Sequence, residues 1–170
     1  MNLKEYIRDV QDFPKPGIGF KDITTLLLNP KALSEGVNQF VKLVEGKKID
    51  KVVAMESRGF FFGPLIANAI GAGFVPVRKP NKLPYDTISQ EYELEYGTDV
   101  LEMHVDAIQK GDKVLIHDDV LATGGTAEAV VKMVEKAGGE IVQLDFLIDL
   151  TFLNGKKKLE GYQINSLIEY

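Results

Sequence analysis

The sequence predicts an α/β fold, in which helices flank a mostly parallel, twisted β-sheet. Short, continuously apolar segments at 51–55, 73–77 and 113–117 are typical of strands that are buried on both faces. Segments between them repeat apolar residues at helical spacing. The 170 residues are 45% hydrophobic and 26% charged, enough to bury one compact core. We therefore expect a single domain over residues 1–170.

The N-terminal part is expected to contain two helices separated by an irregular segment. Residues 2–11 are amphipathic and are predicted to be helical. The segment PKPGIGF (14–20) has two prolines and two glycines, which disrupt regular pairing. Pro30 suits the first turn of a helix, which is expected to run to about Val44.

Strands and helices then alternate along the chain. The expected strands are 51–55, 73–77, 113–117, 140–150 and 164–170. A helix is expected from about Phe60 to Ile70. A second is indicated by apolar residues at helical spacing from Ala127 to Ala137, and Gly138 and Gly139 close it.

One segment does not fit this alternation of buried strands and helices. ISQEYELEYG (88–97) alternates aromatic or aliphatic residues with glutamates, which indicates a strand with one exposed face. It is expected to pair with VLEMHV (100–105) as a β-hairpin. We interpret the region at about 79–99 as a flexible flap added to the sheet.

Two strand ends are expected to form one crevice. ESRGF follows the strand at 51–55, and DDVLATGGTA follows the strand at 113–117. Parallel strands end at the same edge of a sheet, where ligands of open α/β folds bind. The two polar segments are therefore predicted to face each other.

The second of these segments predicts a phosphate-binding loop. The loop consists of Ala122, Thr123, Gly124, Gly125 and Thr126. Adjacent glycines allow a tight turn with its amides directed one way, the threonines add hydroxyl donors, and the helix N-terminus that follows favours an anion. The P-loop pattern GxxxxGK[ST] is absent, as is the third glycine of a dinucleotide-binding turn. The alternative for such a loop alone is an ordinary strand-to-helix turn.

Asp118 and Asp119 lie directly upstream of this loop. Carboxylates would repel a phosphate, but they accept hydrogen bonds from vicinal hydroxyls. A phosphate site beside a diol site is what a ribose 5-phosphate requires. The alternative is that both aspartates are simply solvated.

Composition excludes several other classes. The chain has no cysteine, so disulfides and thiolate chemistry are excluded. A net charge of −5 argues against non-specific nucleic-acid binding. No apolar run is long enough for a membrane helix, and MNLKEYIRDVQDF lacks the apolar core of a signal peptide. We expect a cytoplasmic protein with neither a nucleic-acid nor a membrane partner.

At these residues the sequence resembles the type I phosphoribosyltransferases, and within them the adenine phosphoribosyltransferases. The resemblance spans nearly the whole chain, in FPKPGIGFKDIT (13–24), ESRGFFFG (56–63), VPVRKPNKLP (75–84), YELEYGTD (92–99) and DDVLATGGT (118–126). It implies the type I fold with an N-terminal hood segment. It also implies a magnesium-dependent homodimer that makes AMP and pyrophosphate from adenine and 5-phosphoribosyl pyrophosphate in purine salvage.

The resemblance also implies roles for individual residues. Those expected to bind pyrophosphate are Arg58, Arg78, Lys79 and Lys82, although a solvated loop is an equal alternative for Lys82. Phe20 is expected to stack on adenine, with main-chain groups near Gly19 and Lys21 reaching the edge of the base. Glu95 corresponds to the family's proposed acid–base group for the purine ring proton.

Magnesium is expected near Asp118 or Asp119, bound directly or through water. His104 and His117 are too few and too far apart for a protein metal site, and His117 is expected to be a packed residue with a hydrogen-bond partner. Three positions depart from the family pattern: Gly19 replaces a larger apolar residue, Lys21 an arginine, and Asn81 a glycine.

Two other functions remain open at this point. A 6-oxopurine phosphoribosyltransferase commonly carries a lysine and an aromatic after the phosphate loop, whereas this chain has QLDFLIDL with no lysine. A non-catalytic regulator that keeps the fold would be expected to bring a DNA-binding segment. The sequence favours an enzyme acting on adenine over both.

Overall fold

The computed structural model describes residues 1–93 and 97–170, so Glu95 lies outside the described residues. Its centre is a five-stranded parallel sheet with the strand order β4-β3-β7-β8-β9. The strands are β3 (Lys51–Met55), β4 (Gly73–Val77), β7 (Lys113–Leu121), β8 (Glu140–Asp149) and β9 (Ile164–Glu169).

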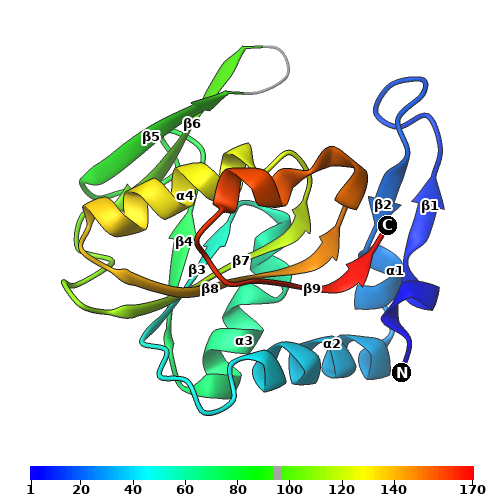
Figure 1. Cartoon of the computed structure of the whole chain (residues 1–170), viewed down its shortest axis with the longest axis horizontal. Helices are drawn as coiled ribbons and strands as arrows, with labels where there is room; N and C mark the ends of the chain where they lie inside the picture. The colour runs from blue at the N-terminus through cyan, green and yellow to red at the C-terminus, as the bar shows by residue number, and fades with distance from the viewer. Residues whose placement is uncertain (94–96) are drawn as a thin grey trace.

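Helices cover both faces of this sheet (Figure 1). The helices α2 (Pro30–Leu43) and α3 (Gly63–Ile70) pack on one face, where Phe40, Phe62 and Leu115 are buried. The other face carries α4 (Gly125–Lys136) and two 3₁₀ helices, η3 (Thr151–Leu153) and η4 (Gly155–Leu159). This architecture confirms the predicted α/β class.

None of the helices in the described part of the chain is both long and apolar enough to span a membrane.

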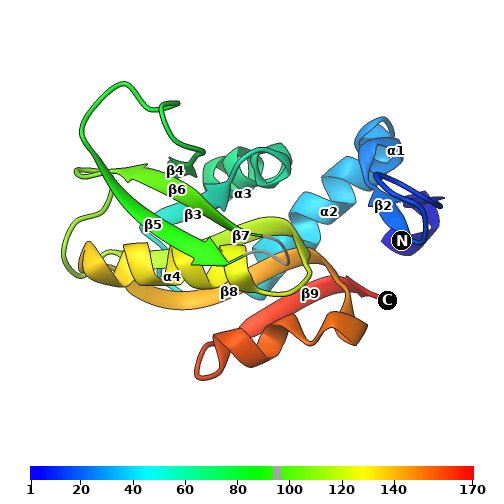
Figure 2. The same cartoon turned by 90° about the horizontal axis from the view of Figure 1, so that it is seen from above.

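The predicted hairpin is present. It consists of β5 (Thr87–Glu93) and β6 (Thr98–His104), which pair antiparallel with Tyr92 opposite Asp99. A bridge between Arg78 and Glu102 joins its second strand to the segment after β4. Figures 1 and 2 show the hairpin on the α4 side of the sheet.

The helix predicted for residues 2–11 is wrong. The chain forms only a short 3₁₀ helix, η1 (Leu3–Tyr6), and then β1 (Arg8–Val10), which pairs antiparallel with β2 (Phe20–Asp22). The short helix α1 (Thr24–Leu27) follows. Pairing with a segment beyond the PKPGIGF turn satisfies the backbone of residues 8–10, and this outweighs a weak local helical preference. Figures 1 and 2 place the loop between β7 and α4 in the space between this arm and the β5–β6 hairpin.

The strand predicted at 113–117 is too short. Strand β7 continues to Leu121, because β8 runs on beside it and pairs Val120 with Ile148 and Leu121 with Asp149. Asp118 and Asp119 therefore lie within the strand rather than after it. The helix predicted from Phe60 is also divided, into η2 (Arg58–Phe61) and α3.

The strand order places a switch point between β3 and β7. From β3 the chain proceeds to β4 on one side, whereas from β7 it proceeds to β8 and β9 on the other. Loops that follow strands on the two sides of such a point turn away from each other and leave a crevice at the carboxyl edge. The two polar segments predicted to face each other follow these two strands.

Three polar side chains in the described part of the sheet are fully buried, those of His117, Gln143 and Asp145. His117 lies edge-on to the Phe40 ring, with centroids 4.9 Å apart, and its Nδ1 lies 3.0 Å from the carbonyl oxygen of Asp145. Its expected role as a packed histidine is confirmed, and burial lowers its pKa to about 4. The Asp145 carboxylate accepts hydrogen bonds from Gln143 Nε2 at 2.8 Å and Asn165 Nδ2 at 2.7 Å.

Asp145 is expected to make stability depend on pH. Burial raises its pKa from 3.8 to about 6, although the hydrogen bonds from Asn165 and Gln143 lower it in part. Because the folded pKa is above the unfolded one, the stabilisation is complete below the unfolded pKa and is lost as pH rises through 6. Relative to an Asp145→Asn variant, the wild type should lose up to about 3 kcal/mol of unfolding free energy between pH 4 and pH 7. Urea unfolding of both proteins across this range measures the difference, and a constant difference would contradict the expectation.

Candidate active site

The predicted phosphate loop connects β7 to α4. Gly124 has φ +83°, a left-handed conformation that favours glycine, and it is the N-cap of α4. Ala122, Thr123, Gly124 and Thr126 line a small cavity of about 70 Å³, together with Asp118 and apolar neighbours. That space suits a phosphoryl group and is too small for a purine.

The N-terminus of α4 is open to a ligand. Among the described residues no side chain caps it, whereas Asn29 Oδ1 caps α2 by accepting from the Lys31 and Ala32 amides at 3.0 and 3.1 Å. The first amides of a helix have no partner within the helix, and the helix dipole makes this end positive. An anion in the small cavity would therefore meet unpaired donors.

A larger cavity of about 420 Å³ adjoins the loop at the carboxyl ends of β3 and β7. It is lined by Glu56, Ser57, Arg58, Lys79, Tyr92, Leu101, Asp118, Asp119, Val120, Ala122 and Thr126. Six of these are predicted site residues, contributed by the two strand ends and by the loop after β4. The predicted convergence of the two polar segments on one crevice is therefore found.

Asp119 is the most deeply buried acid of this cavity. The residue is 3% exposed, and Arg58 Nε lies 3.0 Å from its Oδ2. The Arg58 N–H does not point at this oxygen, which has no hydrogen-bond partner among the described residues. Burial raises the Asp119 pKa although Arg58 lowers it in part, and burial beside a second carboxylate raises that of Asp118 well above the ordinary value. Asp119 Oδ2 thus retains capacity to accept a hydrogen bond from a ligand hydroxyl.

The cations predicted for pyrophosphate are mostly paired with acids. Arg58 pairs with Asp119, and Arg78 Nε donates to Glu56 Oε2 at 3.1 Å. Lys79 contacts the Asp99 carboxylate and lies 3.0 Å from the Tyr92 hydroxyl. Arg78 is not among the residues that line the larger cavity, and neither is Lys82, which is exposed. A pyrophosphate would have to compete with these carboxylates for three of the four cations.

These contacts shift the pKa values of Lys79 and Glu56. Burial alone would lower the Lys79 pKa, but hydrogen bonds with Asp99 and Tyr92 outweigh it and raise that pKa. Burial alone would raise the Glu56 pKa, but the Lys79 backbone N–H and the Arg78 side chain lower it overall. The raised pKa of Lys79 and the lowered pKa of Glu56 keep both side chains charged at neutral pH.

The predicted base platform reaches the same region. The Arg58 guanidinium lies 4.7 Å from the Phe20 ring centroid, and the Phe13 ring contacts Phe20 edge-on at 5.1 Å. The Lys21 side chain instead contacts Asp9 and lies over the Tyr170 ring, so only its main chain can serve a base. Gly19 lies just before β2.

The acidic residues of the cavity fit a magnesium ion that binds together with a phosphate-bearing ligand. In the described ranges 1–93 and 97–170, no three acidic, histidine or cysteine side chains cluster as a metal site. Mg²⁺ commonly binds through one or two carboxylates and completes its shell with phosphate oxygens and water. Asp118 and Asp119 fit this role, in which the protein supplies only one or two of the ligands. Among the described residues, Asp119 Oδ2 is buried without a hydrogen-bond partner.

Comparison with known proteins identifies the family. The family described as phosphoribosyl transferase domain matches residues 23–160. The adenine phosphoribosyltransferase of Flavobacterium johnsoniae is 64% identical over 170 residues and is covered over 100% of both chains. The chain belongs to the adenine phosphoribosyltransferase family. The resemblance found in the sequence is confirmed.

Solved adenine phosphoribosyltransferases share the fold. The crystal structure from Thermoanaerobacter pseudethanolicus is 54% identical, with a TM-score of 0.97 over 99% of this chain and 98% of that one. The enzyme from Saccharomyces cerevisiae, complexed with adenine and an imino-altritol bisphosphate, is 40% identical, with a TM-score of 0.94 over 97% and 96% of the two chains. The predicted type I phosphoribosyltransferase fold is confirmed.

Three polar residues that line the larger cavity of this adenine phosphoribosyltransferase family member were not among the predicted site residues. Glu56 and Ser57 begin the quoted ESRGF segment, and their position at a strand end was the available signal. Tyr92 was assigned only to a face of the hairpin, yet it lines the larger cavity. Asn81, where the resemblance led us to expect glycine, adopts φ +64°, a conformation that asparagine tolerates better than most residues.

Proposed function

We propose that this chain is an adenine phosphoribosyltransferase that transfers the phosphoribosyl group of 5-phosphoribosyl pyrophosphate (PRPP) to adenine, giving AMP and pyrophosphate for purine salvage. The observation that carries the proposal is the uncapped glycine loop of 122–126 beside the buried carboxylates Asp118 and Asp119, at the switch point of the sheet. A ribose 5-phosphate needs these two subsites side by side.

Each part of PRPP has a matching group in this site. The amides of 122–126 bind the 5-phosphate, and Asp118 and Asp119 accept hydrogen bonds from the ribose hydroxyls. Arg58, Arg78, Lys79 and Lys82 attract the pyrophosphate and stabilise the charge that develops as it leaves. Displacement at the anomeric carbon then needs no covalent nucleophile.

Adenine enters between the N-terminal β1–β2 arm and the β5–β6 hairpin. Phe20 stacks on the base, and main-chain groups near Gly19 and Lys21 bind its edge. Glu95 of the flap handles the purine ring proton, and the flap, closed over the site, keeps water from the reactive sugar.

Asp118 or Asp119 would hold Mg²⁺ on the protein side, directly or through water, and the ion would supply charge neutralisation for the pyrophosphate. The enzyme acts in the cytoplasm as a homodimer. The exposed apolar side chains of Phe61 and Leu65, 40% and 41% exposed, are available for such an interface.

One assay tests the activity and its alternatives. The protein is mixed with Mg²⁺, PRPP and one base at a time, and nucleotide and pyrophosphate are measured. AMP formed from adenine in preference to nucleotides from guanine or hypoxanthine supports the proposal. Preference for guanine or hypoxanthine would assign the chain to the 6-oxopurine phosphoribosyltransferases. If no base leads to release of pyrophosphate, a non-catalytic regulator would be favoured.

Phe20→Ala is expected to raise KM for adenine by about 10- to 100-fold, because stacking on an aromatic ring contributes about 1–3 kcal/mol per base. KM for PRPP at saturating adenine should change little, since the phosphate loop is untouched. Steady-state kinetics with each substrate varied measures both constants. Phe13→Ala is the comparison, because this half-exposed ring contacts Phe20 only edge-on. A larger adenine effect in Phe13→Ala would assign the platform to Phe13.

A further inference from the structure

The phosphate loop is in direct backbone contact with a segment far along the chain. A Cβ atom on Gly124 would lie 2.5 Å from the carbonyl oxygen of Gly155, the first residue of η4. A Cβ atom on Gly155 would in turn lie 2.3 Å from the carbonyl oxygen of Ala122. Both distances are below the 3.0 Å that real Cβ atoms essentially never violate. Each position therefore admits only glycine while the two backbones stay where they are.

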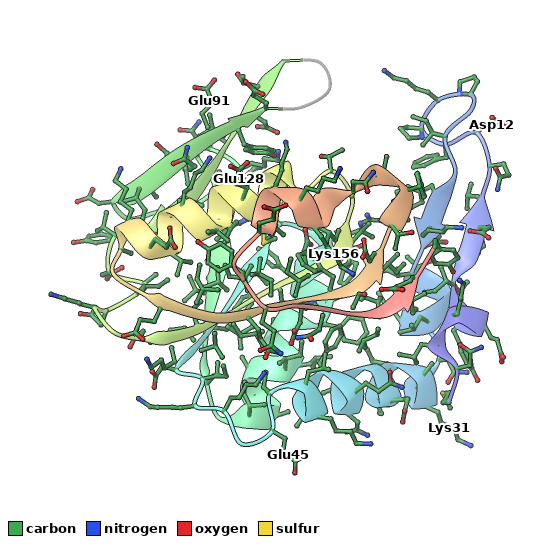
Figure 3. All side chains as sticks on the ribbon, in the orientation of Figure 1. Asp12, Lys31, Glu45, Glu91, Glu128 and Lys156 are labelled. Atoms are coloured by element: carbon green, nitrogen blue, oxygen red, sulfur yellow. The ribbon has the colours of Figure 1, made fainter. Side chains whose placement is uncertain are left out.

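The segment 151–159, which includes Gly155, is held by contacts with the end of β8, the C-terminal residue and the core. Lys156 Nζ lies 2.7 Å from Oδ2 of Asp149, a 1%-exposed residue at the end of β8. The Thr151 hydroxyl donates to the Tyr170 carbonyl at 2.7 Å, and Leu159 is fully buried in the core. Figure 3 labels Lys156 where this segment lies over the sheet. With both ends of the segment held, we expect a side chain added at Gly155 to displace the phosphate loop rather than the segment.

We propose that Gly155 is a positioning residue for the 5-phosphate site. Its close backbone contact with Ala122 and Gly124 sets where the loop amides stand relative to the N-terminus of α4. Gly155 itself touches no substrate and acts only through the loop. The inference rests on the proposed function, because it assigns Gly155 to the phosphate end of that same site.

A side chain at this position should act selectively on the phosphate. An added methyl group would force the loop away by roughly an ångström, and a misplacement of that size can weaken a positioned interaction by up to about 100-fold. The adenine platform at Phe20 belongs to the N-terminal arm and would keep its place. Ligands with a 5-phosphate should therefore lose affinity while ligands without it keep theirs.

The test compares AMP with adenosine, which lacks the phosphate. In the full chain, Gly155→Ala is expected to raise the Kd of AMP and KM for PRPP by about 10- to 100-fold. The Kd of adenosine and KM for adenine should stay at the wild-type values. Isothermal titration calorimetry and steady-state kinetics measure these four constants. Gly73→Ala is the control: its closest contact would be the flexible Lys51 side chain, at 3.2 Å from Cδ, and the Asp50 carbonyl oxygen lies at an ordinary 3.7 Å, so no constant should change.

Each outcome decides the matter. Unchanged AMP affinity in Gly155→Ala, or an equal loss for AMP and adenosine, overturns the positioning role. If circular dichroism shows that this variant does not fold, Asp149→Asn is used instead. It weakens the anchor of Lys156 and removes a negative charge, and the lost charge alone would strengthen phosphate binding. A selective loss of AMP affinity in Asp149→Asn supports the proposal, and unchanged or tighter binding overturns it.

The two proposals fail in distinguishable ways. A wild-type protein that makes no AMP refutes the proposed function. A wild-type protein that makes AMP, beside a Gly155→Ala variant with wild-type constants, refutes only the role of Gly155.

Discussion

Asp119→Asn is expected to lower kcat/KM for PRPP by about 10- to 150-fold. Asparagine has the same shape but replaces a charged acceptor with a neutral amide, and a hydrogen bond to a charged group contributes about 1.5–3 kcal/mol. Asp119 Oδ2 is buried and has no hydrogen-bond partner among residues 1–93 and 97–170, so a ribose hydroxyl is the donor that it would gain in the complex. The Arg58 guanidinium also loses the carboxylate that holds it 3.0 Å away. Steady-state kinetics with PRPP varied measures the loss.

The same substitution should leave the fold at least as stable. Burial raises the pKa of Asp119, so the ionised side chain opposes folding at any pH above that raised value. A neutral asparagine avoids this cost, and thermal unfolding at pH 8 should show an equal or higher Tm. Asp145→Asn is the matched control, because it also removes a fully buried carboxylate but lies outside the cavity residues. A wild-type KM and kcat in Asp119→Asn would contradict the role in ribose binding.

Glu95→Gln is expected to lower kcat by about 100- to 10,000-fold, the range that a positioned acid–base group supplies. Glutamine keeps the shape of the side chain but cannot transfer the proton. Both KM values should change little, because the phosphate, ribose and base subsites use other residues. The measurement is kcat at saturating adenine and PRPP, and this expectation rests on the sequence, since Glu95 lies outside the described residues.

Glu91→Gln provides the matched control. Glu91 alternates with Glu93 and Glu95 on the same predicted face of the hairpin, and Figure 3 shows it on the hairpin beside α4, which carries Glu128. It lines a cavity between the hairpin and α4 that shares Tyr92 with the larger cavity and Gly125 with the phosphate loop. Glu91 itself lines neither of the two site cavities, so its loss should leave kcat unchanged. Equal losses in both variants would mean that the charge of this face, rather than one acid–base group, matters.

The parts of the site that are contiguous in sequence were predictable. Asp118, Asp119 and the loop 122–126 occupy one short segment, and their order along the chain fixes their order in space. The alternation of apolar strands with amphipathic helices likewise gave the parallel sheet and its carboxyl-edge crevice. Both features could be predicted because glycine conformations, helix ends and hydrophobic periodicity depend on residues that are close together in the sequence.

The errors occurred where distant segments compete with local preference. Residues 8–10 read as part of a helix but form a strand, since Phe20–Asp22 pairs with them. Strand β7 extends through the two aspartates because β8 continues alongside it. A periodicity in one segment does not reveal which other segment will satisfy its backbone.

By itself, the sequence determined the fold class and the family, and it supplied the hypothesis that the loop at 122–126 binds phosphate. Tertiary structure alone decided which charges meet: Arg58 with Asp119, Arg78 with Glu56 and Lys79 with Asp99. It also placed Gly155 behind the phosphate loop. The physical reason is that ion pairing and backbone packing depend on distance in space, which for residues far apart in the chain is set by how the whole core packs.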